Sequence, residues 1–131
     1  MDWDTWAAKT ELTLAVGSDS RFRDLFAPGG CFSDPVTPAT TDIESIEQIT
    51  ETSFPDWRQR ITSIRGDARS GAFEWIGQGT LGGSTPIEIH GCTVVDVDDA
   101  GQVTSWRDYF DLKQVERQLG APVGGADGGE S

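Results

Sequence analysis

Apolar residues recur at helical spacing near the start of the chain, and they predict an amphipathic helix over residues 3–16. Asp2 or Asp4 would cap the start of this helix, and Gly17 would stop it. The spacing is that of a helix face packed on a core, so we interpret its tryptophans as core and not as a ligand site. The buried face would consist of Trp3, Trp6, Ala7, Thr10 and Leu14.

Two more helices and one strand are expected before residue 56. Pro28-Gly29-Gly30 would break the second helix, and residues 31–34 would form a short strand. After a polar loop over residues 35–40, Thr41-Asp42-Ile43-Glu44 fits a capping box that begins the third helix, and Pro55 closes it. The second, short helix is expected to carry Phe22, Leu25 and Phe26.

The second half of the chain alternates apolar and polar residues with the period of two that strands require. His90, the single histidine, falls on the polar side of its strand and is expected at the surface. Strands are predicted over residues 57–65, 72–81, 86–97 and 103–110. The apolar side of the third of these would contain Ile87, Ile89, Gly91, Thr93, Val95 and Val97.

Helices followed by antiparallel hairpins favour an α+β domain. We expect a strongly curved mixed or antiparallel sheet, wrapped on the three N-terminal helices as a cone with one internal pocket. Asp111 would cap a terminal helix that contains Val115 and Leu119. Residues 1–120 are assigned to a single domain, and the Gly-rich acidic tail over residues 121–131 is predicted to be disordered.

Composition limits the classes of partner. The chain of 131 residues has 22 acidic and 10 basic residues, a net charge of -12, and no cluster of Lys and Arg interleaved with aromatics. This argues against nucleic-acid and anionic-membrane binding. No apolar run approaches the roughly 20 residues of a membrane span, and no signal peptide is evident at the start. The separated Cys31 and Cys92 are interpreted as reduced thiols in a cytoplasmic protein.

Two aspartates stand among aromatic residues on predicted strands. Asp34 lies in Cys31-Phe32-Ser33-Asp34-Pro35-Val36, and Asp108 lies in Trp106-Arg107-Asp108-Tyr109-Phe110-Asp111. Burying an acid disfavours its charged form, so such a residue is turned to solvent, paired with a cation or used in proton transfer. The alternatives are a turn-capping role for Asp34 before Pro35 and a salt bridge from Asp108 to Arg107 or another arginine.

These two segments and the order of elements resemble the ketosteroid-isomerase-like superfamily, also called nuclear transport factor 2-like, over residues 3–119. The superfamily includes the SnoaL-like polyketide cyclases. The last strand is similar to that of limonene-1,2-epoxide hydrolase, which implies that Asp108 activates water. The Arg-x-Asp pair of that hydrolase aligns with Glu74-Trp75-Ile76, so the pair is absent and Glu74 is the candidate replacement acid.

Asp34 matches the general base of ketosteroid isomerase, but the oxyanion-hole tyrosine of that enzyme is absent from the first helix, and Thr93 stands at the position of its acid. A third group with this fold, the epoxide-opening cyclases and pyran-forming enzymes, uses two carboxylates without the Arg-x-Asp pair. One carboxyl protonates the leaving oxygen and the other accepts a proton from the nucleophile. This chemistry fits the residues present best.

The sequence therefore predicts a cofactor-free enzyme, an epoxide hydrolase or cyclase, acting on a hydrophobic polyketide- or terpene-like substrate. An isomerase or dehydratase and a non-catalytic ligand-binding module are the alternatives. No metal set and no phosphate-binding loop are evident, and the resemblance implies a homodimer through the outer sheet face. The catalytic candidates are Asp34, Asp108 and Glu74. The substrate-binding candidates are Phe32, Trp75, Ile76, Ile89, Gly91, Thr93, Trp106 and Phe110.

Overall fold

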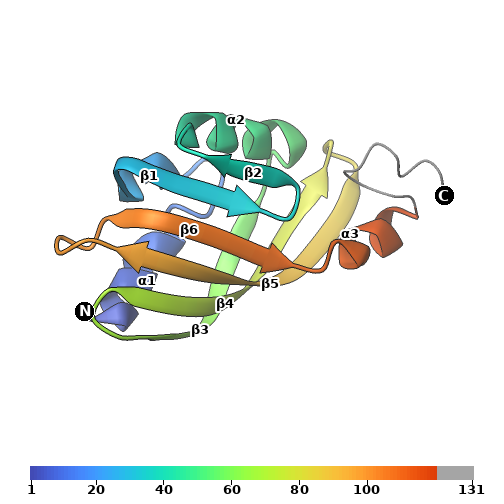
Figure 1. Ribbon diagram of the computed structural model, residues 1–131. Helices are drawn as coiled ribbons and strands as arrows, with labels where there is room; N and C mark the ends of the chain where they lie inside the picture. Colours follow the sequence, from blue (N-terminus) through green and yellow to red (C-terminus); the bar gives the residue numbers. More distant parts are fainter. Residues whose placement is uncertain (121–131) are drawn as a thin grey trace.

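The computed structural model describes residues 1–120 as a six-stranded mixed sheet with three α-helices and one short 3-10 helix (Figure 1). This confirms the expected α+β class. The helices are α1 (Trp3–Glu11), the 3-10 helix η1 (Phe22–Leu25), α2 (Ile43–Ser53) and α3 (Leu112–Leu119). The strands are β1 (Phe26–Asp34), β2 (Thr37–Thr40), β3 (Arg58–Gly66), β4 (Ser70–Leu81), β5 (Thr85–Val97) and β6 (Val103–Phe110).

The strand order is β2-β1-β6-β5-β4-β3, and the sheet is open, with β2 and β3 at its edges. β1 and β6 run parallel, whereas every other neighbouring pair is antiparallel. The chain thus brings its first long strand beside its last one, as Figure 1 shows for β1 and β6. Among residues 1–120, no helix is long and apolar enough to cross a membrane.

Aspartate side chains begin each α-helix by accepting hydrogen bonds from backbone N–H groups that have no partner within the helix. Asp2 Oδ1 accepts from the Thr5 N–H at 3.1 Å, and Asp2 is one of the two expected caps. Asp42 starts α2, and Asp111 starts α3 as expected. The capping residue of α2 is therefore the second residue of the predicted capping box and not its threonine.

The first helix is shorter than its apolar spacing predicts, because it ends at Glu11 and not at residue 16. Residues 14–16 instead run along the edge strand β3. There the Leu14 carbonyl accepts from the Gln59 N–H at 2.8 Å, and Glu11 Oε1 accepts from the Ile61 N–H at 2.6 Å. These contacts satisfy β3 backbone groups that have no strand neighbour on that side, a tertiary effect that helical spacing does not reveal.

The first strand is longer than expected and passes through the predicted helix breaker. Phe26 lies in β1 and not in the second helix, which is a 3-10 turn over Phe22–Leu25. The pairing of β1 with β6 shifts register between Phe26 and Cys31, and Gly29 adopts a positive φ of 79° there. The Pro-Gly-Gly segment therefore makes an irregularity within the strand, as glycine often does. The expected loop over residues 35–40 contains the short strand β2.

The core centres on Trp106, which is 1% exposed. Its ring packs edge-to-face on Phe22 with 4.8 Å between ring centroids, and on Phe73 with 5.4 Å. Trp3 and Trp6 of α1 are buried in the same cluster, so these tryptophans belong to the core, as predicted from the sequence. Edge-to-face pairs of this kind fix the positions of the rings as well as burying apolar surface.

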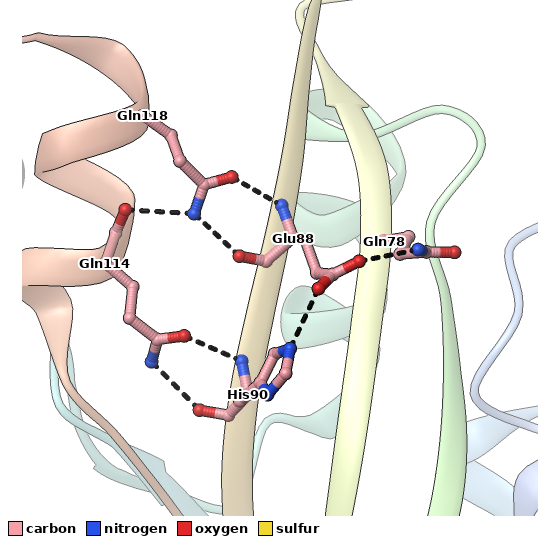
Figure 2. A network of polar contacts seen from close by, with 5 residues as sticks. All are labelled: Gln78, Glu88, His90, Gln114 and Gln118. Carbon is pink, nitrogen blue, oxygen red and sulfur yellow. Dashed lines mark hydrogen bonds and ion pairs between the residues drawn. The ribbon is translucent and has the colours of Figure 1, made fainter.

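The last helix is attached to β5 by side-chain amides (Figure 2). β6 pairs with β5 only as far as Phe110 opposite Gly91, so the preceding residues of β5 lack a strand partner on this side. Gln114 and Gln118, one helical turn apart, hydrogen-bond to β5 residues two apart, because both spacings are about 6 Å. Each glutamine bonds the N–H and the C=O of one residue, Gln118 with Glu88 (both 2.7 Å) and Gln114 with His90 (both 2.9 Å).

His90 lies on the exposed face of β5, as predicted, with Nε2 2.8 Å from Glu88 Oε2 (Figure 2). Glu88 also accepts a hydrogen bond from Gln78 of β4 at 2.7 Å. This polar cluster therefore belongs to the outer side of the sheet, opposite Ile87 and Ile89, which are buried.

Candidate active site

A cavity of about 380 Å³ opens between the inner side of the sheet, α2, α3 and the segment that follows α1. Its walls are mostly aromatic and aliphatic, and several elements contribute to them. Such a composition suits a small hydrophobic ligand. The aromatic walls are Phe22, Phe32, Phe54, Trp57, Trp75 and Phe110.

Asp34 and Asp108 both line this cavity, as expected from the sequence. The parallel strands β1 and β6 place Ser33 opposite Arg107, so the two aspartates are the next positions along neighbouring strands. Neighbouring strands lie about 5 Å apart, which sets the scale of the separation between the two residues. Fold topology therefore joins two acids that are 74 positions apart in the sequence, from Asp34 to Asp108.

The alternative of a salt bridge between Asp108 and Arg107 is excluded. Arg107 points to the other face of β6, where Nη1 lies 3.1 Å from Asp96 Oδ2 and 2.5 Å from Ser105 Oγ. Successive residues of a strand point to opposite faces, so the adjacent arginine cannot reach the cavity.

Neutral donors surround the Asp108 carboxyl instead. The Thr93 hydroxyl donates to Asp108 Oδ1 at 2.5 Å, and Trp106 Nε1 donates to the same oxygen at 2.8 Å. Thr93 in turn accepts a hydrogen bond from Trp75 Nε1 at 2.8 Å. Among the described residues, no hydrogen bond to Asp108 Oδ2 is formed, which leaves that oxygen for a ligand.

Burial raises the pKa of Asp108 from 3.8 to about 7, because the charged carboxylate is removed from water. The hydrogen bonds from Thr93 and Trp106 lower this pKa, and the negative charge of Asp34 raises it. Near neutral pH, Asp108 therefore exists in both protonation states. A group in this condition is suited to give or take a proton.

Asp34 is half-buried, and one of its oxygens serves the local turn: Oδ1 accepts from the Val36 N–H at 2.9 Å. The turn-capping interpretation of this residue is thus correct, and it is compatible with a place in the cavity wall. The other oxygen, Oδ2, is available to bind a ligand in the cavity.

Glu74 lies outside the cavity, contrary to its expected role as a replacement acid. It is exposed on the outer face of β4, where Oε1 accepts from the Ser63 hydroxyl at 2.7 Å. Ile76 shares this outer face and does not line the cavity either. Both lie on the side of β4 opposite to Trp75, since alternate residues share a face.

The other expected binding residues divide into walls and supports. Phe32, Trp75, Ile89 and Phe110 line the cavity. The supporting residues are Gly91, Thr93 and Trp106, which do not line it. Gly91 lies beneath the Trp75 indole, where any Cβ would overlap the ring.

Several lining residues were not expected, including Leu14, Phe22, Trp57, Gln59 and Val115. Alternation along the 57–65 strand carries a signal for Trp57 and Gln59, which share a face with Ile61. Val115 comes from α3, Phe22 from the 3-10 helix η1 and Leu14 from the irregular segment after α1, and tertiary packing alone brings them to the cavity. The described residues contain no group of three or more His, Cys, Asp or Glu placed to hold a metal ion.

Comparison with known proteins agrees with this architecture. Residues 11–106 match the family model described as the SnoaL-like domain, and no curated protein matches the chain. A hypothetical protein of ketosteroid isomerase-like fold from Catenulispora acidiphila, in complex with trimethylamine, has 23% identity, 92% coverage of both chains and a TM-score of 0.73.

Two further solved structures carry names that describe an activity. A putative SnoaL-like polyketide cyclase from Jannaschia sp. CCS1 has 19% identity and a TM-score of 0.66, covering 81% of this chain and 83% of its own. An LEH-like epoxide hydrolase from M. tuberculosis has 19% identity and a TM-score of 0.62, covering 74% of this chain and 73% of its own. At these identities the likeness shows the fold.

Proposed function

The chain belongs to the SnoaL-like family, and we propose that it is a cofactor-free enzyme that opens an epoxide in a hydrophobic substrate. The observation that carries the proposal is the pairing of Asp34 and Asp108 in one apolar cavity, with the pKa of Asp108 raised to about 7. Two carboxyls in different environments divide acid and base roles.

In the proposed step, Asp108 is the general acid. It gives its proton to the epoxide oxygen as the carbon–oxygen bond of the ring breaks. The oxygen of water or of a substrate hydroxyl forms the new bond to that carbon and gives its proton to the Asp34 carboxylate. Proton transfer from Asp34 to Asp108 then restores the starting state. Each positioned acid or base contributes about 10²- to 10⁴-fold to the rate.

The cavity walls support a hydrophobic substrate. Apolar and aromatic side chains dominate them, and a folded chain held there would bring its own hydroxyl close to the epoxide. The choice between hydrolysis and cyclisation would then depend on whether water or a substrate hydroxyl occupies the site beside Asp34. The proposal includes the homodimer and the cytoplasmic location that the sequence resemblance and composition favour.

The same pair of acids supports a second candidate function, proton transfer next to a carbonyl group. Asp34 would remove the proton, and the neutral form of Asp108 would donate a hydrogen bond to the enolate oxygen. A protonated carboxyl in an apolar site performs this role in ketosteroid isomerase. The raised pKa of Asp108 is the specific observation that favours this alternative.

The test is turnover in ¹⁸O-labelled water with a panel of epoxides that includes limonene 1,2-epoxide and 4,5-epoxy alcohols. Wild type is compared with Asp34→Asn and Asp108→Asn, and with Asp96→Asn as a matched control from the outer face of β5. A labelled diol that both cavity variants fail to form would support a hydrolase. An unlabelled ring product of unchanged mass, lost in the same two variants, would support a cyclase.

Turnover that survives in both cavity variants would contradict the assigned roles. No product from any epoxide, with saturable quenching of tryptophan fluorescence by the same compounds, would reject the enzyme and favour a binding module. Isomerisation of an unsaturated ketone by the protein that leaves every epoxide unchanged would favour the second candidate.

A further inference from the structure

We infer that Thr93 and Trp75 are positioning residues that keep Oδ1 of Asp108 a hydrogen-bond acceptor and leave Oδ2 as the oxygen that carries the transferable proton. The role of this proton in turnover rests on the proposed function, whereas its location does not. Two hydrogen bonds connect β4, β5 and β6 in series, from Trp75 to Thr93 and from Thr93 to Asp108, and the chemistry of each group decides which one donates.

Trp75 must be the donor in the first of these bonds, because an indole N–H can only donate. Its Nε1 lies 2.8 Å from Thr93 Oγ1, so the threonine oxygen is the acceptor of that bond. A hydroxyl has one proton, and this proton must point elsewhere. The only other hydrogen bond formed by Thr93 Oγ1 among the described residues is the one of 2.5 Å to Asp108 Oδ1.

Asp108 Oδ1 therefore accepts from Thr93 whether or not the carboxyl is protonated. Trp106 Nε1, a second indole donor, lies 2.8 Å from the same oxygen. A proton placed on Oδ1 would point toward one of these two donors, and that donor would be left without its acceptor. Because Thr93 and Trp106 are 0% and 1% exposed, no water replaces the lost partner. The proton of neutral Asp108 accordingly lies on Oδ2.

The backbone makes this geometry available at Gly91, the residue opposite Trp75 in the pairing of β4 with β5. The indole lies across Gly91 in space that any side chain there would fill, and it reaches along β5 to Thr93. Thr93 and Asp108 are themselves directly opposite one another in β5 and β6. Three consecutive strands thus build one support behind a single carboxyl oxygen.

Few other charged groups surround the cavity, and none of them takes part in the hydrogen bonds that link Trp75, Thr93 and Asp108. Asp34 is on β1, Arg21 precedes η1, and Glu47 and Glu51 are on α2. Arg21 and Glu51 lie 3.9 Å apart, and Glu47 accepts from the Arg23 N–H at 2.8 Å. The strands β4 and β5 contribute no ionisable side chain to the cavity lining.

The test is a ¹³C NMR titration of the Asp108 carboxyl in the full chain, assigned by loss of its signal in Asp108→Asn. Thr93→Val keeps the shape of the side chain and removes the hydroxyl, so we expect the Asp108 midpoint to rise by roughly one pH unit. Thr93→Ser should restore the wild-type midpoint, because serine can make both hydrogen bonds. Trp75→Phe should move the midpoint in the same direction by less, since the hydroxyl remains but is no longer oriented.

An unchanged midpoint in both Thr93→Val and Trp75→Phe, with native near-UV circular dichroism, would overturn the inference. If Thr93→Val fails to fold, Trp75→Phe and the Thr93→Ser rescue decide the question. When epoxide turnover is followed beside the titration, its pH profile should move with the Asp108 midpoint. A moved midpoint in a protein that opens no epoxide would support the hydrogen-bond chain and reject the proposed function.

Discussion

Replacing Asp108 with Asn should stabilise the protein at neutral and higher pH and leave its stability nearly unchanged below about pH 4. Asparagine resembles the protonated acid: its Oδ1 can accept from Thr93 and Trp106, and its amide takes the place of the protonated oxygen. Unlike the acid, it does not ionise. The variant therefore removes the ionisation of one buried group while retaining the bonds around it.

The magnitude follows from the pKa of Asp108, which burial raises from 3.8 to about 7. Each pH unit of difference corresponds to about 1.4 kcal/mol, so the full effect is about 4 kcal/mol. Below pH 4 both the folded and the unfolded wild type hold the proton. As the pH rises from about 4 to about 7, only the unfolded chain releases it, so the free energy of unfolding of wild type falls. Above pH 7 both states are ionised and the loss is constant.

Urea denaturation at intervals from pH 4 to pH 9 measures this effect as the difference between Asp108→Asn and wild type. Subtracting the two curves cancels the titration of the other acids. Asp96→Asn is a contrasting control, because hydrogen bonds from Ser70 and Arg107 hold the pKa of Asp96 below its ordinary value. Its difference from wild type should stay nearly constant from pH 4 to pH 9, because a carboxyl with a lowered pKa is ionised in both the folded and the unfolded state over that range. Curves for Asp108→Asn and wild type that stay parallel from pH 4 to pH 8 would refute the reasoning.

Two further predictions concern the packing at Gly91 and the hydrogen bonds that attach α3 to β5. Gly91→Ala should lower the free energy of unfolding by about 1–3 kcal/mol in urea denaturation, because the new methyl group overlaps the Trp75 indole, and a variant as stable as wild type would disprove that contact. In the double variant Gln114→Leu, Gln118→Leu, the backbone amides of Glu88 and His90 on β5 should exchange hydrogen about 10-fold faster or more, because they lose their acceptors. Arg117→Leu, on the exposed side of α3, should leave this exchange rate unchanged.

The sequence predicts the orientation of side chains best where one face of a helix or strand is buried. On β5 the alternation of Ile87, Ile89, Thr93, Val95 and Val97 assigns the inner side correctly, because a strand with one buried face has no freedom of register. The aspartate caps are equally local signals. The pairing of the two cavity acids comes from family resemblance, since no local pattern places the first strand beside the last.

The errors have specific physical causes. Alternation along β4 implies that Trp75 and Ile76 face opposite sides, so both cannot line one cavity, and Glu74 faces outward with Ile76. The expected end of α1 at residue 16 is wrong because residues 14–16 pair with an edge strand, a contact between distant segments. The supporting role of Thr93 depends on an indole from the neighbouring strand, which one sequence does not reveal.

The residue type at position 108 is itself an argument for proton transfer. If this side chain only accepted hydrogen bonds from Thr93 and Trp106, asparagine would serve equally well and would avoid the unfavourable ionisation of a buried acid. What a carboxyl adds there is the ability to change protonation near neutral pH. An Asp108→Asn variant that is more stable at pH 8 and inactive would show that the protein gives up stability at this position for chemistry.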